Sequence, residues 1–361
     1  MKKICFFSGD ITRSGGTERV SAMIANELAK QGRYEICFLS LCEQKEAPFY
    51  MLHEDIIRYR LGETWIQPGP GYLPLIPKIR RFFKGHEIDV VIDIDIVLDS
   101  LSIPAAWKLK TKVLSWEHSN CIFEMSVLYR RAILKFSVKH SDYVVTLTES
   151  DRKHYEQILR RTQNIEAIYN PMEKAGSIEA EKRENRIITV GRLVAGKGMD
   201  FLAEAAVRVL KKHTDWKWFL LGEGEERPFL ERIIRENQLE EQLILTGLVP
   251  NVGEYLAQSK IFVLTSKSEG LPMCLLEAKA YGLPCISFDI PTGPDEIIEE
   301  GSNGFLIKPF DCEDMVGKIN SLIEDDRLLL KFTQNANKNM EKFQMAGIME
   351  KWNRVLDDLC E

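Results

Sequence analysis

Residues 187–198 read Ile-Ile-Thr-Val-Gly-Arg-Leu-Val-Ala-Gly-Lys-Gly, and the fold class follows from this stretch. The β-branched run Ile187–Val190 predicts a buried strand, and the glycine-containing turn that follows leads into a helical pattern. Strand, turn and helix together form one unit of an α/β protein. The same alternation extends along the chain in both directions, which indicates a parallel, doubly wound sheet.

Short apolar runs alternate with helical periodicity through both halves of the chain. In the first half, the segment Glu18–Lys30 carries its apolar residues on one face, and Gly32 follows it as a helix-ending residue. Near-continuous runs of valine, isoleucine and phenylalanine are typical of parallel strands that are buried on both faces. The predicted strands are Ile4–Phe7, Ile36–Leu41, Ile56–Leu61, Val90–Ile94, Val113–Trp116, Tyr143–Leu147, Glu166–Tyr169, Ile187–Val190, Phe219–Leu221, Leu243–Thr246, Ile261–Leu264, Cys285–Phe288 and Phe305–Ile307.

Length and composition agree with a globular protein of two domains. The chain has 361 residues, of which 45% are hydrophobic, and this is enough for two cores. No apolar run approaches the ~20 residues that span a bilayer, and the apolar start is too short for a secretory signal, so we expect a cytoplasmic protein. The net charge of −6 gives no reason to expect nucleic acid as a partner. The eight cysteines lack zinc-site or disulfide spacing, and we expect most of them in the core.

The polar segment Pro171–Arg186 is the best candidate for a linker. It divides the chain into an N-terminal domain, residues 1–170, and a C-terminal domain, residues 171–343. Residues 344–361 complete the chain with a helix around Ile348–Leu359, after a break near Gln344–Gly347. Two α/β domains facing each other would enclose a cleft, and ligands of such sheets bind at the carboxyl ends of the strands.

Three motifs follow predicted strands and could carry chemistry. Gly15 and Gly16 lie where the first strand turns into a helix, so they form either a phosphate-contacting turn or a merely flexible one. Arg192 offers a bidentate fork and Lys197 a point charge, so this pair could hold one diphosphate, or be two solvated cations. Glu269 and Glu277 are eight residues apart, the first in a loop and the second on a helix, and they could face the same ligand or simply be exposed.

In this order, the motifs resemble those of the family 4 retaining glycosyltransferases. The match includes Gly15-Gly16, Gly191-Arg192-Leu193 with Lys197, Gly222-Glu223-Gly224, Glu269-Gly270 with Glu277-Ala278, and Gly282-Leu283-Pro284. It extends over nearly the whole chain and is strongest in the second half. The resemblance implies the GT-B fold, in which two Rossmann-like, doubly wound α/β domains face each other across a cleft, the first for the acceptor and the second for a nucleotide-sugar donor.

The resemblance also implies roles for individual residues. Arg192 and Lys197 would bind the diphosphate of the donor, Glu269 its sugar and Glu277 its ribose, while His118, at the end of a predicted strand, would face the sugar. Glu269 could also be read as a covalent nucleophile, and a histidine in this position is often only structural. The other implied donor-binding residues are Gly15, Gly16, Gly222, Glu223, Gly270, Leu271, Met273, Cys274 and Leu275.

One position departs from the common family pattern. Where many members have Glu-Gly-Phe-Gly, this chain has Glu269-Gly270-Leu271-Pro272. Proline has no backbone N–H, so one hydrogen bond to the donor is removed, although proline is well tolerated in the first turn of a helix. The departure indicates a subfamily with altered donor contacts.

The implied reaction is the transfer of a hexose or N-acetylhexosamine from a nucleotide diphosphate, UDP ahead of GDP, to a glycan in cell-surface polysaccharide synthesis. The acceptor would be carried on polyprenyl diphosphate. Two cations can stabilise the departing phosphate, so no metal or other cofactor is expected. The route proposed for this family is a front-face attack, in which the departing phosphate takes the proton of the acceptor. This route would need no enzymic nucleophile.

Several alternatives stay open from the sequence. The Asp-x-Asp motif formed by Asp93 and Asp95 is typical of metal-dependent GT-A transferases. A GT-B epimerase would act on the donor alone, and a catalytically idle partner subunit would only bind it. The basic stretches Lys78–Lys84 and Arg130–Lys139 interleave cations with apolar residues, so each could rest on an anionic membrane surface or be an ordinary half-buried helix.

Overall fold

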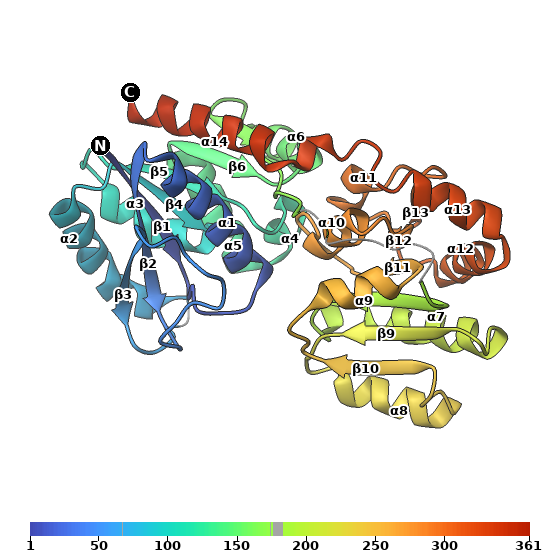
Figure 1. Ribbon diagram of the computed structural model, residues 1–361. Helices are drawn as coiled ribbons and strands as arrows, with labels where there is room; N and C mark the ends of the chain where they lie inside the picture. Colours follow the sequence, from blue (N-terminus) through green and yellow to red (C-terminus); the bar gives the residue numbers. More distant parts are fainter. Residues whose placement is uncertain (67, 174, 176–182) are drawn as a thin grey trace. The chain divides into compact units, whose positions relative to one another are not determined.

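The chain forms two compact units in the computed structural model (Figure 1), which describes residues 1–66, 68–173, 175 and 183–361. The first unit combines Met1–Pro171 with Met345–Glu361, and the second consists of Met172–Gln344. The predicted linker Pro171–Arg186 includes residues 174 and 176–182, which lie outside the described residues.

A seven-stranded parallel sheet forms the centre of the first unit. Its strands lie in the order β3-β2-β1-β4-β5-β6-β7. The central strands β1 and β4 are buried because their side chains are apolar on both faces. The strands are β1 (Lys2–Ser8), β2 (Tyr34–Cys42), β3 (Ile57–Gly62), β4 (Val90–Ile94), β5 (Lys112–Trp116), β6 (Tyr143–Thr146) and β7 (Ile165–Ala167).

Helices connect and cover these strands, as the alternating sequence predicts. The first, α1 (Gly16–Gln31), ends where Gly32 adopts a φ of 65°, a conformation that glycine takes without strain. The remaining α-helices of the unit are α2 (Ile76–His86), α3 (Asp99–Ala106), α4 (Cys121–Ser126), α5 (Leu128–His140), α6 (Glu149–Leu159) and α14 (Met345–Cys360).

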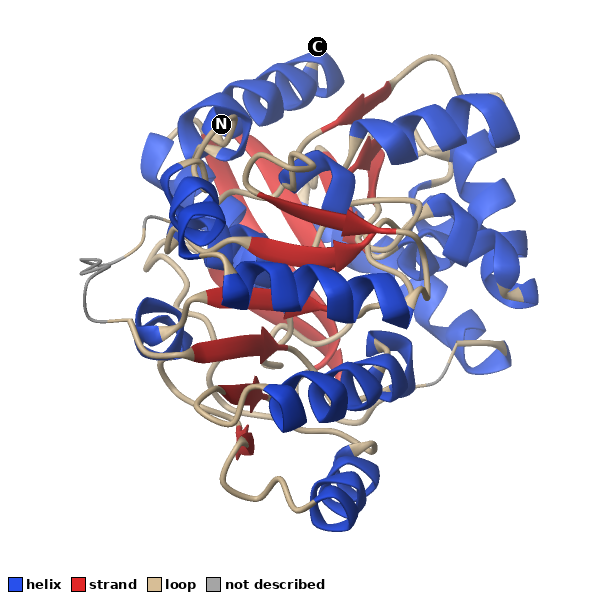
Figure 2. Cartoon of the chain, turned by 90° about the vertical axis from the view of Figure 1, so that its right-hand side faces the viewer, coloured by secondary structure: helices blue, strands red, loops and turns tan. Residues whose placement is uncertain are grey.

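The second unit contains a six-stranded parallel sheet in the order β10-β9-β8-β11-β12-β13. Helices lie on both sides of the strands (Figure 2). The strands are β8 (Arg186–Val190), β9 (Lys217–Leu221), β10 (Leu243–Gly247), β11 (Ile261–Leu264), β12 (Cys285–Phe288) and β13 (Gly304–Ile307). The helices are α7 (Met199–Lys212), α8 (Arg227–Asn237), α9 (Val252–Gln258), α10 (Met273–Ala280), α11 (Pro294–Ile297), α12 (Cys312–Glu324) and α13 (Asp326–Gln334).

The strand order reverses once in each sheet, and the reversal marks where a ligand can bind. In the first sheet it lies between β1 and β4, and in the second between β8 and β11. The loops after two such strands diverge to opposite faces and leave a crevice at their carboxyl ends. The candidate residues after β8 and β11 therefore meet at the reversal point of the second sheet.

The C-terminal helix α14 packs on the first unit, although its sequence follows the second. Its buried Trp352 meets Trp116 of β5 edge-on, with ring centroids 4.7 Å apart. Asp357 accepts hydrogen bonds from Arg33 and Tyr34 at 2.8 and 2.7 Å. The predicted break at Gln344–Gly347 is too long, because α14 begins at Met345 and a single glycine does not interrupt it.

The Asp-x-Asp motif lies at the carboxyl end of β4, where both aspartates have structural partners. Asp93 is buried and accepts a hydrogen bond from Ser102, and Asp99 accepts one from Ser115 at 2.6 Å. Asp95 pairs with Arg130 at 3.1 Å and caps the next turn through the backbone N–H of Val97. These contacts give Asp93 and Asp95 structural roles at the end of β4, which do not fit the GT-A interpretation.

The buried Asp93–Asp99 pair should make the stability of the protein depend on pH. Burial, more than any other cause, raises the pKa of Asp99 to about 6 from 3.8. The folded state therefore holds a proton that the unfolded state has released. The resulting stabilisation is complete below pH 4 and is lost as the pH rises through about 6.

We expect the Asp99→Asn variant to lose this dependence, because asparagine does not titrate. Between pH 4.5 and 7.5 the native protein should lose about 2 kcal/mol of unfolding free energy through this group. The variant should lose less, although the buried Asp93, whose pKa is also raised by burial, keeps its own contribution. Urea denaturation at both pH values measures the difference. The exposed Asp55→Asn serves as the control, and equal pH profiles for the native protein and Asp99→Asn would contradict the assignment.

No helix among the described residues is long and apolar enough to cross a membrane. All eight cysteines are free thiols, and five of them are buried in the cores, as predicted for most of them: Cys5, Cys42, Cys121, Cys285 and Cys312.

Candidate functional site

The loops that follow β8 and β11 are joined by backbone contacts. The hydroxyl of Thr265 donates a hydrogen bond to the carbonyl oxygen of Lys197 at 2.9 Å, and the N–H of Lys267 donates to that of Gly196 at 3.0 Å. Gly198 has a φ of +67°, and a Cβ atom built on it would lie 2.0 Å from the carbonyl oxygen of Thr265. Only glycine fits there, so this contact fixes the position of the preceding Lys197.

Lys197 and Glu269, which are 72 residues apart, form an ion pair at this point. The Nζ atom lies 2.5 Å from Glu269 Oε1, which also accepts a hydrogen bond from the hydroxyl of Ser266 at 2.6 Å. Burial alone would lower the pKa of Lys197, but the nearby Glu269 carboxylate outweighs it and raises the pKa. The lysine is therefore charged at neutral pH, and its position next to the carboxylate is set before any ligand binds.

Arg192 lies in the same loop and has no such partner. Its side chain is exposed and makes no hydrogen bond or ion pair with the described residues. Arg227, by contrast, pairs with Glu223 at 2.6 Å and with Glu231 at 2.9 Å. The guanidinium of Arg192 is thus available to an anion at the carboxyl end of β8.

The Gly222-Glu223-Gly224 segment supports this loop from the neighbouring strand β9. A Cβ atom at Gly222 would lie 1.9 Å from the carbonyl oxygen of Gly191, and one at Gly224 would lie 2.2 Å from that of Leu193. The N–H of Leu193 also donates to the carbonyl oxygen of Glu223 at 2.9 Å. For Gly222, close backbone packing explains the glycine, and the side chain of Glu223 is engaged by Arg227.

The other predicted donor-binding residues lie around the start of α10. Pro272 is the residue before the helix, so its missing N–H removes no helical hydrogen bond. Leu271 and Leu275 are buried, which leaves their backbone rather than their side chains for a ligand. Gly270, Met273 and the partly exposed Glu277 lie on the same segment. Burial, followed by the charge of Glu269, raises the pKa of Cys274, so this thiol is protonated at neutral pH.

A third loop, after β12, holds the Glu269–Gly270 turn in place. The hydroxyl of Thr292, which is fully buried, donates to the carbonyl oxygen of Glu269 at 2.5 Å. A Cβ atom at Gly293 would lie 2.8 Å from the carbonyl oxygen of Gly270. Sequence reasoning missed Thr292 and Ser266 as supports of Glu269, although the Pro291-Thr292-Gly293 motif was a visible signal.

In the first unit, Gly15 and Gly16 lie where α1 begins. Gly15 is the residue before the helix, and a Cβ atom on it would lie 2.1 Å from a carboxylate oxygen of Glu18. The preceding turn is organised by the buried Asp10, which accepts hydrogen bonds from the backbone and side chain of Thr12. The geometry allows close approach of a ligand, but a phosphate here would also face the acidic Glu18.

His118 follows β5 and packs against Trp116, with ring centroids 4.3 Å apart. Its Nε2 atom is buried without a hydrogen-bond partner among the described residues. Burial lowers its pKa to about 3, so the imidazole is neutral at physiological pH. A neutral ring with an unused nitrogen can donate or accept a hydrogen bond, depending on its tautomer, but does not contribute a positive charge.

The basic stretch Lys78–Lys84 differs from the bilayer-facing arrangement that the sequence left open. On α2, Phe83 is buried in the core, because the helix packs that face on the sheet, and Phe82 packs against Tyr59 and His86. Arg80 is also engaged, since it donates to the carbonyl oxygens of Ala105 and Trp107. Of the two interpretations of Lys78–Lys84, the ordinary half-buried helix fits these contacts of Phe83 and Arg80.

Two family models match the chain, one over each half. Residues 14–174 match the model described as Glycosyltransferase Family 4, and residues 173–339 match Glycosyl transferases group 1. An uncharacterized glycosyltransferase of Haemophilus influenzae is 32% identical over 357 residues, which cover 99% of this chain and all of that protein. The chain belongs to glycosyltransferase family 4.

Relatives of this family 4 glycosyltransferase include enzymes of bacterial glycan synthesis. The amylovoran biosynthesis glycosyltransferase AmsD of Erwinia amylovora is 28% identical over 99% of this chain and all of that protein. A Campylobacter jejuni N-acetylgalactosaminyltransferase, named for an undecaprenol-diphosphate-linked acceptor, is 24% identical over 99% of both chains.

Solved structures of glycosyltransferases show the same fold. The lipopolysaccharide outer core galactosyltransferase WaaB superimposes with a TM-score of 0.77 over 99% of both chains at 23% identity. Sucrose-phosphate synthase from Thermosynechococcus elongatus gives a TM-score of 0.84 over 99% of both chains at 17% identity. The GT-B fold class predicted from the sequence is thereby confirmed, and the enzyme acts as a glycosyltransferase on a nucleotide-sugar donor.

Proposed function

We propose that this enzyme transfers a hexose or N-acetylhexosamine from a UDP-sugar to a glycan acceptor, with retention of anomeric configuration. The main support is the Lys197–Glu269 ion pair at the reversal point of the second sheet, with the unpaired Arg192 in the same loop. UDP is favoured over GDP because several similar structures were solved with it. One is the Staphylococcus aureus TarM complex, 26% identical with a TM-score of 0.68 over 77% of this chain and 58% of that one.

In the proposed mechanism, the second unit binds the donor and supplies the cations for the leaving group. Lys197 and Arg192 neutralise the charge that develops on the diphosphate as the sugar departs. Glu269 keeps Lys197 in place and accepts hydrogen bonds from sugar hydroxyls, while Glu277 contacts the ribose. The departing phosphate takes the proton of the acceptor hydroxyl, so no enzymic nucleophile and no metal are needed in this route.

The first unit is assigned to the acceptor, with Gly15, Gly16 and His118 reaching the donor. A neutral His118 suits a hydrogen bond to a sugar hydroxyl, because it adds no charge that would compete with Lys197 for the phosphate. The acceptor is proposed to be carried on polyprenyl diphosphate at the inner face of the cell membrane, by analogy with the named acceptor of the Campylobacter relative. AmsD supports a place in exopolysaccharide synthesis.

Calorimetric titration with UDP, GDP, UDP-sugars and GDP-mannose tests the donor site. We expect selective UDP binding, which the Arg192→Ala variant weakens about 10- to 100-fold because a charge-assisted contact is lost. Arg327→Ala, at an exposed arginine of α13 without a side-chain partner among the described residues, is the matched control.

The outcomes of this titration test the identity of the donor nucleotide and the role of Arg192 separately. Preferred binding of GDP would correct the donor, and equal losses in the two arginine variants would contradict the role of Arg192. Product analysis with the donor alone distinguishes the open alternatives. An epimerase would convert the sugar nucleotide without an acceptor, and an idle partner subunit would bind it without transfer to any acceptor offered.

A further inference from the structure

A surface pocket of about 480 Å³ lies in the first unit, at the amino edge of its sheet. Its walls come from the C-terminal part of α5 and from residues 159–164, which lead into β7. His118 follows the carboxyl end of β5, at the opposite edge of this parallel sheet. Within the first unit, the pocket is therefore at the opposite edge of the sheet from His118.

Four cations and no carboxylate line this pocket. The cations are Lys135, Lys139, Arg160 and Arg161, and the remaining lining residues are Val138, Leu159, Thr162, Gln163 and Asn164. Like charges held around one concavity repel one another, and a bound anion would relieve that repulsion.

One of the four cations has a structural role that explains its presence. Arg161 donates to the carbonyl oxygen of Val138 at 2.9 Å and to that of Ser141 at 3.2 Å, so it caps the end of α5. Burial lowers its pKa, with the charge of Asp142 opposing that effect. The side chains of the other three, Lys135, Lys139 and Arg160, make no hydrogen bond or ion pair with any described residue.

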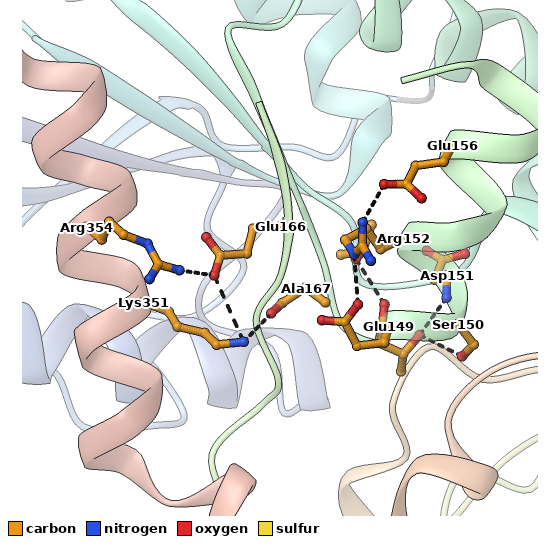
Figure 3. Close-up of polar contacts among 11 residues, drawn as sticks. Glu149, Ser150, Asp151, Arg152, Glu156, Glu166, Ala167, Lys351 and Arg354 are labelled. Atoms are coloured by element: carbon orange, nitrogen blue, oxygen red, sulfur yellow. Dashed lines mark hydrogen bonds and ion pairs between the residues drawn. The ribbon is translucent and has the colours of Figure 1, made fainter. Parts of the chain in front are cut away.

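Two arginines on neighbouring elements, unlike these three cations, have carboxylate partners. On α6, whose last residue Leu159 lines the pocket, Arg152 donates hydrogen bonds to Glu149 at 2.8 Å and to Glu156 (Figure 3). Across from it, Arg354 of α14 pairs with Glu166 of β7. Carboxylates therefore neutralise Arg152 and Arg354, whereas no carboxylate lines the pocket.

We propose that this pocket binds a phosphate-bearing anion, either the headgroup of an anionic lipid or a free polyphosphate. Lysine and arginine are the side chains that bind phosphate oxygens best, and the apolar Val138 and Leu159 allow the attached chain or ring to remain in contact with the wall. The framing helices also expose Phe136 and Ile158, to 37% and 46%. The pocket adds a phosphate-binding site to the membrane contact considered for Arg130–Lys139. Phosphate binding here does not depend on the proposed transfer reaction.

The test uses inorganic pyrophosphate and lipid vesicles on the full chain. Calorimetry with pyrophosphate is carried out in an Arg192→Ala/Lys197→Ala background, which removes the cations assigned to the donor. In parallel, flotation compares vesicles of phosphatidylcholine with vesicles that also contain phosphatidylglycerol. The pocket variant is Lys139→Glu/Arg160→Glu. The control is Lys110→Glu/Lys153→Glu, which changes the net charge equally at exposed lysines outside the pocket.

We expect the pocket variant to weaken anion binding about tenfold or more and the control to weaken it by less than about threefold. A loss confined to pyrophosphate identifies a free phosphate compound as the ligand, and a loss of flotation with the anionic vesicles identifies a lipid headgroup. If neither probe binds, or if the pocket and control variants lose binding equally, the proposal is wrong. Should the charge reversals impair folding, Lys135→Gln/Lys139→Gln replaces them under the same criteria.

Discussion

The Lys197→Ala variant is expected to lose about 10²- to 10³-fold in kcat, because it removes a preorganised charge from the departing diphosphate. The side chain is already held 2.5 Å from Glu269, so no reorganisation is needed when the donor binds. Alanine also leaves the carboxylate of Glu269 without its cation, next to the phosphates. Steady-state transfer assays with saturating donor measure the loss.

Lys267→Ala is the matched control for this prediction. Lys267 lies in the loop after β11 and pairs with Asp200 at 2.8 Å. It is partly exposed, so its removal should change kcat less than about threefold and stability by less than about 1 kcal/mol. A near-normal kcat for Lys197→Ala with an intact fold would remove Lys197 from the mechanism.

The Gly198→Ala variant is expected to lose about 3 kcal/mol or more of unfolding free energy in the second unit. The left-handed φ of +67° alone costs an alanine about 1 kcal/mol. The larger part comes from a Cβ atom 2.0 Å from the carbonyl oxygen of Thr265, a contact that forces the two loops apart. Denaturant titration followed by tryptophan fluorescence measures the loss.

Gly196→Ala offers a control from the same loop. A Cβ atom there has no heavy atom within 4 Å, and the residue is outside the left-handed region. Its unfolding free energy should stay within about 0.5 kcal/mol of the native value. Equal stabilities for the two alanine variants would show that the loops can separate at little cost.

Much of the fold could be predicted because each buried parallel strand corresponds to a short apolar run in the local sequence. The strands Ile261–Leu264 and Cys285–Phe288 have the predicted bounds, since their burial on both faces leaves a clear signal. The last strand of the first sheet was less clear. Predicted at Glu166–Tyr169, it spans Ile165–Ala167, because an edge strand ends where its partner β6 stops pairing.

The site was predictable residue by residue, but not as a set of contacts. The pair Lys197–Glu269 depends on β8 and β11 being neighbours in the sheet, and strand order is not written in local sequence. For the same reason, the packing of Gly222 against Gly191 looked like a ligand-binding feature. The choice between Phe82 and Phe83 as the buried ring could not be predicted, because a run of cations around two phenylalanines does not say which ring faces the core.

The position of α14 also has a consequence for how the protein is made. The second unit, Met172–Gln344, is continuous in sequence, whereas the first needs Met345–Glu361 to complete it. At about 5–20 residues per second, a ribosome takes on the order of ten seconds or more to translate the intervening unit. Throughout that time Trp116 lacks its partner Trp352. The domain that is synthesised first is therefore completed last, and its apolar surface beneath α14 stays uncovered until Met345–Glu361 has been made.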